Sequence, residues 1–143
     1  MSTLNGQVLG QAHYATRALL ERELATVGVD FPQSVVLNAL AGEGGALDRA
    51  RLVDRMTGTL KIAEAAALTT VAELTASGLV QARPDATTLA LTEAGRSAQR
   101  RIAEAVAGIT ARLYGDIPAD ELAVAGHVLT LVKQRADAAL VGA

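Results

Sequence analysis

Residues 74–96 read LTASGLVQARPDATTLALTEAGR, and this stretch decides the fold that the sequence predicts. It holds two runs suited to β-strands with a turn sequence between them, namely 79–83, 87–91 and Pro84-Asp85-Ala86. Proline presets a turn backbone and aspartate bonds nearby amides, so we expect the runs to form a hairpin. Gly78 is placed to end a helix before the hairpin, and Thr92 to cap a helix after it. The stretch therefore predicts helix, hairpin and helix in that order.

The sequence before the hairpin predicts a helix-turn-helix. Residues 48–56 form a short amphipathic pattern, and residues 60–77 carry apolar side chains at i, i+4 and i+7, namely Ala67, Val71 and Leu74. Thr57-Gly58-Thr59 separates the two patterns and is expected to break the helix there. Two short helices joined by a turn that contains glycine are typical of a helix-turn-helix, and a hairpin directly after it is a wing.

Longer helices are expected at both ends of the chain. Helical spacing predicts helices over about 4–27, 32–41, 92–114 and from Asp120 to about Leu140. In the last of these, apolar residues occupy most of the circumference: Leu122, Val124, Ala125, Val128, Leu129, Leu131 and Val132. A second copy of the chain would cover such a helix in a twofold dimer, and the alternative is a helix buried within a monomer. The predicted fold class is mainly α, a winged helix-turn-helix with a small β-hairpin wing and long helices that form a dimerisation region.

Composition excludes several classes of function. The 143 residues carry a net charge of -2 and no cysteine, so disulfides and thiolate chemistry are excluded and a reducing compartment fits best. His13 and His127 stand outside any metal-ligand spacing, so no metal site and no cofactor are expected. Serine and glycine motifs of hydrolases and nucleotide-binding loops are missing, so no catalytic residues and no enzyme are expected.

The first residues lack a signal-peptide pattern, and no apolar run approaches the roughly 18 residues of a membrane span, so a cytoplasmic protein without a membrane partner is expected.

The order of elements, together with the motifs LTASGLV (74–80), LTEAGR (91–96) and IPADEL (117–122), resembles the MarR family of bacterial winged-helix transcriptional regulators. The resemblance covers nearly the whole chain. It implies one MarR-like domain over residues 1–143, with 1–29 and 92–143 forming the helical dimerisation region and 30–91 the winged helix-turn-helix. It also implies a homodimer that binds double-stranded DNA and is released from it by a small-molecule effector.

Candidate DNA-binding residues follow from the chemistry of such a protein. Arginines and lysines bind phosphates, and polar side chains of the second helix read base edges. The candidates are Arg49, Arg51, Arg55, Lys61, Glu64, Thr69, Thr70 and Arg83, with Leu68 or an alanine able to touch a thymine methyl group. The arginine that is usual at the wing tip of the family is missing. The predicted DNA-binding surface contains five cations and five anions, so its net charge is zero. Two hypotheses stay open, a DNA-binding regulator or a winged-helix dimer that has lost DNA binding and acts as a ligand-binding or protein-interaction module.

The first helix carries the candidate effector site. His13, Tyr14 and Arg17 occupy neighbouring turns where the resemblance would place one wall of an effector pocket. Arg17 could hold an acidic group of the ligand while Tyr14 stacks or donates a hydrogen bond. The alternative is that these side chains lie at a dimer interface. Arg96, Arg100, Arg101 and Glu104 are interpreted as a solvated face of the long helix, with Arg100 and Glu104 at i, i+4 spacing.

Overall fold

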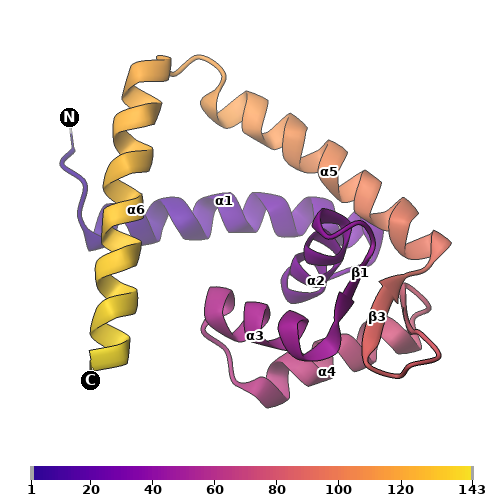
Figure 1. The fold of residues 1–143 in the computed structure, drawn as a ribbon. Coiled ribbons are helices and arrows are strands. Elements are labelled where there is room, and N and C mark those ends of the chain that lie inside the picture. Colours follow the sequence, from indigo (N-terminus) through magenta and orange to yellow (C-terminus); the bar gives the residue numbers. More distant parts are fainter. Residues whose placement is uncertain (1, 143) are drawn as a thin grey trace. The chain divides into compact units, whose positions relative to one another are not determined.

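The computed structural model describes residues 2–142. Its elements, in chain order, are α1 (Gly6–Val27), α2 (Phe31–Gly42), β1 (Ala46–Asp48), α3 (Arg49–Leu60), α4 (Glu64–Ala76), β2 (Val80–Ala82), β3 (Thr88–Leu91), α5 (Glu93–Tyr114) and α6 (Ala119–Gly142). Figure 1 shows this course of the chain. The mainly helical winged helix-turn-helix expected from the sequence is confirmed.

Local capping explains where the first two helices begin and end. The side chain of Asn5 accepts a hydrogen bond from the amide of Val8 at 2.9 Å, and Gly28 ends α1 in the left-handed conformation at φ 86°. Asp30 and Gln33 form a reciprocal capping box at the start of α2, where each side chain bonds the other residue's backbone amide. Asp30 is thus the N-cap of α2.

The turn of the helix-turn-helix lies later than the sequence pattern predicts. Asp48 caps α3 by accepting from the amides of Ala50 and Arg51, and the helix continues through Gly58 to Leu60. It ends at Lys61, a non-glycine residue in the left-handed conformation at φ 58°. The expected break at residues 57–59 is therefore wrong, because a single glycine inside a helix lowers its stability without ending it.

The wing belongs to a three-stranded antiparallel sheet in the order β1-β3-β2. The predicted hairpin is confirmed, with Val80 opposite Leu91 and Ala82 opposite Leu89. The third strand, β1, was not predicted, because three residues are too short to show an alternating pattern. It forms by pairing with β3, where Leu47 lies opposite Leu89, so the inner strand of the wing is bonded along both of its edges.

One core holds these elements together. It is built from aliphatic side chains of α1 to α5 and the sheet, and the largest fully buried ones are Leu24, Leu37, Leu40, Leu52, Met56, Leu74, Leu89 and Ile102. Helices α3 and α4 pack against each other, and each also contacts a strand of the sheet. This packing fixes the position of α4 relative to the wing.

The chain divides into two compact units, Met1–Ile109 and Thr110–Ala143. The first contains α1 to β3 and most of α5, so α1 groups with the winged helix-turn-helix. The second contains the last turn of α5 and α6, and no described residue of α6 is buried. The single-domain organisation with dimerisation regions at 1–29 and 92–143 stays a prediction.

Across residues 2–142, no single helix has both the length and the apolar composition of a membrane span. Helices α1 and α2 pass that test only when taken together, as a pair bent by 77°.

Candidate nucleic-acid interface

Helix α4 has one buried and one exposed face. Ala67, Thr70, Val71 and Leu74 are buried against the core. The opposite face is exposed, and it carries Glu64, Ala65, Leu68, Thr69 and Ala72. The exposed face of α4 is therefore available to a partner, and it carries no basic side chain.

Thr70 does not belong to that exposed face. Its side chain is only 6% exposed, and its hydroxyl donates to the carbonyl of Ala66 at 3.1 Å. The expectation that Thr70 contacts DNA is wrong, because it lies three and four residues from the buried Ala67 and Leu74 and so shares their side of the helix.

Arg49 occupies the centre of the candidate interface. Its backbone amide donates to the carbonyl of Thr87 at 2.7 Å, which ties the start of α3 to the wing turn. Its side chain lines a shallow hollow with Ala86 and Thr87 of the wing, and a second hollow with Glu64 and Leu68 of α4. Arg49 is thus the cation that adjoins both the wing and the exposed face of α4.

The other two arginines of α3 lie near Glu43. Arg55 donates to the Glu43 carboxylate at 2.8 Å, and this hydrogen bond and the charge of Arg55 hold the pKa of Glu43 below its usual value. The charge of Arg51 lowers that pKa further. Arg55 therefore has an acidic partner that the sequence did not indicate, because Glu43 lies twelve residues away in the chain.

The turn of the wing is held by Asp85. Its carboxylate accepts from the amides of Thr88 and Thr87 and from the Thr88 hydroxyl, and these bonds hold its pKa below the usual value. Ala86 completes the turn in the left-handed conformation at φ 64°. Arg83 is exposed at the start of this turn, where its backbone carbonyl accepts from Ala86.

Lys61 lies in the turn between α3 and α4 instead of within a helix. Its ammonium donates to the carbonyl of Gly58 at 2.7 Å. The candidate cations therefore lie on three elements around α4: the helix α3, the turn after it and the wing.

The candidate effector residues share one stretch of α1. The rings of His13 and Tyr14 meet edge to face at 5.5 Å, and Tyr14 is 71% exposed. Arg17 pairs with Glu21 at 2.5 Å and lies 4.4 Å from the centre of the Phe31 ring. The charge of Arg17 is thus already engaged, which makes it a weaker ligand for an acidic group than the sequence suggests.

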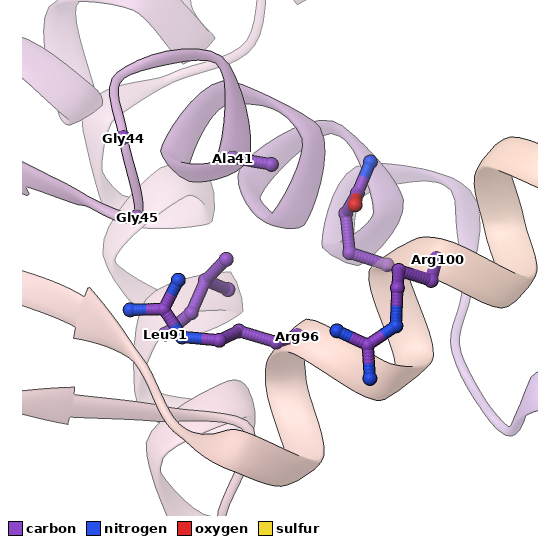
Figure 2. A pocket seen from close by; sticks show the side chains of 7 residues that line it. Ala41, Gly44, Gly45, Leu91, Arg96 and Arg100 are labelled. Atoms are coloured by element: carbon purple, nitrogen blue, oxygen red, sulfur yellow. The ribbon is translucent and has the colours of Figure 1, made fainter.

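A cavity that sequence reasoning missed lies between the end of α2 and the start of α5. It measures about 250 Å³ and is lined by Ala41, Gly44, Gly45, Leu91, Arg96, Gln99 and Arg100 (Figure 2). The Arg96 guanidinium packs so closely against Gly45 that a Cβ there would lie 2.9 Å from it. Neither Arg96 nor Arg100 forms an ion pair within residues 2–142, and the expected pairing of Arg100 with Glu104 is not formed. Sequence patterns could not reveal this cavity, because its walls come from residues 41–45 and 91–100, which are far apart in the chain.

These features define a winged helix-turn-helix protein. No protein-family model matches the sequence, and no curated protein sequence matches it. Solved structures do match, and among them are MarR-family transcriptional regulators. The fold implied by the resemblance to that family is therefore confirmed.

Three of these structures cover most of both chains. CouR from Rhodococcus jostii RHA1, bound to p-coumaroyl-CoA, has a TM-score of 0.76 and 18% identity over 90% of each chain. A mutant MarR from E. coli complexed with operator DNA has a TM-score of 0.72 and 18% identity, covering 89% of this chain and 91% of its own. NadR in complex with 4-hydroxyphenylacetate has a TM-score of 0.73 and 21% identity, covering 91% and 95%.

Proposed function

We propose that this protein is a homodimeric DNA-binding transcriptional regulator of the MarR type that acts in the cytoplasm and responds to a small acidic effector. The observation that carries the proposal is a winged helix-turn-helix in which the half-buried Arg49 adjoins the exposed face of α4, with an exposed Arg83 on the wing. A structural neighbour with this fold is complexed with operator DNA, which supports the same role here. No enzymatic activity is proposed.

The division of charge fits the way proteins divide their contacts with DNA. Contacts to phosphates position a protein, and contacts to base edges supply specificity. Arg49 adjoins α4 and the wing turn, and Arg83 is exposed at the start of that turn, so both suit phosphate contacts while the exposed face of α4 lies in the major groove. The predicted DNA-binding surface carries five cations and five anions, and its net charge of zero predicts modest affinity with a shallow dependence on salt.

Replacing Arg83 with alanine should weaken binding to all DNA sequences alike. Each dimer loses two phosphate contacts, so the slope of log K against log salt should fall by about 2. Arg49→Ala should have the same effect, and Arg22→Ala, which removes an exposed charge on α1, is the matched control. Fluorescence anisotropy with DNA from the promoter next to the gene, titrated at low and moderate salt, measures these slopes.

The alternative is a winged-helix dimer that has lost DNA binding. The acidic Glu64 at the start of α4 and the pairing of Arg55 with Glu43 are the observations that favour it. Absence of sequence-specific binding at low salt would establish this alternative and exclude the regulator.

The dimer is proposed from the exposed apolar side chains of the last helix. Val124, Leu129, Val132 and Leu140 are 64%, 37%, 43% and 63% exposed. A stretch of this kind is typical of an interface between copies of a chain. A second copy is the simplest partner because closed twofold dimers are the commonest assemblies.

The effector is proposed to bind the cavity beside Arg96 and Arg100. The volume of the cavity is slightly below the usual range of ligand pockets, which suits a small aromatic acid. The guanidinium groups of Arg96 and Arg100 form no ion pair within residues 2–142, and they suit a carboxylate. NadR, a structural neighbour, holds 4-hydroxyphenylacetate. The sequence-predicted group His13, Tyr14 and Arg17 is the competing location.

The two locations can be separated by calorimetric titration with 4-hydroxyphenylacetate. Arg100→Gln should weaken binding about tenfold, because a charge-assisted hydrogen bond is worth about 1.5 kcal/mol or more. Tyr14→Phe should leave the affinity unchanged. The opposite result would place the effector on α1.

A further inference from the structure

Between Glu64 at its start and Glu73 near its end, the exposed face of α4 presents mainly methyl and methylene groups. Leu68 is 41% exposed, and Ala65 and Ala72 lie one turn before and after it. The Thr69 hydroxyl donates to the carbonyl of Ala65 at 2.9 Å, so its proton is engaged within the helix. Thr75 likewise donates to the carbonyl of Val71 at 2.9 Å.

The sequence of α4, EAAALTTVAELTA, also excludes the usual readers of purines. Guanine is recognised in the major groove by arginine or lysine, and adenine by asparagine or glutamine. Helix α4 contains none of these four residues. The base-edge features that remain are the thymine methyl group, which aliphatic side chains contact, and the cytosine amino group, which Glu64 can accept from.

We propose that α4 recognises pyrimidines, and above all that Leu68 and its alanine neighbours read the C5-methyl groups of thymines. This inference rests on the proposed DNA-binding function. Residues 65–72 span about 10 Å along the helix, which corresponds to about three base steps. The preferred half-site therefore contains a short run of T·A pairs. One thymine methyl group lies under Leu68, and its neighbours lie under the alanines. Specificity at these positions comes from contacts between aliphatic side chains and thymine methyl groups, and not from hydrogen bonds to base edges.

The experiment replaces single thymines by deoxyuridine, which removes only the methyl group. A duplex selected from a random library serves as the probe, and each thymine of the half-site is replaced in turn. At the pair under Leu68 the loss of the methyl group should lower affinity about three- to fivefold, because burial of one methyl group contributes that much. A 5-methylcytosine·guanine pair at the same place should bind more tightly than cytosine·guanine, which shows whether the methyl group itself is read.

Variants at Leu68 complete the test. Leu68→Ala should abolish the difference between thymine and deoxyuridine at one position, and Leu68→Met, which keeps an apolar side chain of similar reach, should preserve it. Leu68→Gln should shift the preference toward adenine. Because Leu68 lies outside the core, thermal melting should show that all three variants fold.

The outcomes separate this inference from the function on which it rests. Sequence-specific binding with no penalty for deoxyuridine at any position would overturn methyl reading and leave the DNA-binding function standing. Absence of specific binding to any duplex at low salt would overturn both.

Discussion

Gly95→Ala should lower the free energy of unfolding by about 3 kcal/mol, the largest effect expected of any single methyl group added to this chain. Gly95 is buried in the first turn of α5, where its amide donates to the Thr92 hydroxyl at 3.0 Å. A Cβ at this position would overlap the carbonyl oxygen of Leu79. That oxygen cannot retreat freely, because it accepts the amide of Thr92 at 3.1 Å.

A matched control lies in the same helix. Gly108 is also helical, but a Cβ there would meet nothing within 4 Å. Gly108→Ala should therefore stabilise the protein by about 0.5 to 1 kcal/mol, because alanine loses less backbone entropy on folding. Urea unfolding at a fixed protein concentration measures both variants. Equal and small effects at positions 95 and 108 would contradict the close packing of α5 on the backbone of Leu79.

The second large effect is expected in the last helix. Val132→Asp should convert the proposed dimer into a monomer at micromolar concentration. Twofold symmetry places the new carboxylate in the interface twice, and two carboxylates desolvated at about 2 kcal/mol each should raise the dimer dissociation constant roughly a thousandfold. Sedimentation velocity over a range of concentrations reads out the change directly.

Gln134→Asp is the control for this substitution. It adds the same charge to the same helix, but residue 134 lies about 200° around the helix from residue 132, and its side chain is polar and exposed. The control should remain dimeric. A wild-type chain that sediments as a monomer would remove the dimer altogether, and an unchanged Val132→Asp dimer would place the interface elsewhere.

The features that could be predicted from the sequence are those that depend on neighbouring residues. The Asp30 cap, the turn around Asp85 and the cap at Thr92 each use a side chain that bonds a backbone amide two or three residues away. Both partners of such a bond lie within a few consecutive residues, so these bonds can be predicted from sequence. The same holds for the hairpin and for the exposed face of α4. Gly95, within the motif at 91–96, marks a close approach that only the folded chain explains.

The features that escaped prediction depend on residues far apart in the chain. Strand β1 exists because β3 lies beside it, and Arg55 is engaged because Glu43 reaches it from another element. The cavity beside Arg96 is lined on one side by the turn at Gly44 and Gly45, which comes next to α5 only in the folded chain. Helix α3 continues past Gly58, and Leu60, beyond the glycine, packs against the core, a contact with residues far away in the chain.

The central place of β3 has a mechanical consequence. Backbone hydrogen bonds join β3 to β1 on one side and to β2 on the other, and the carbonyl of Thr87 accepts from the amide of Arg49, so the wing is bonded directly to the start of α3. A force applied at the tip of the wing is transmitted through the ladder to the start of α3 and through β2 to the end of α4. In the proposed regulator, a switch that releases the protein from DNA would therefore move the wing together with α3 and α4.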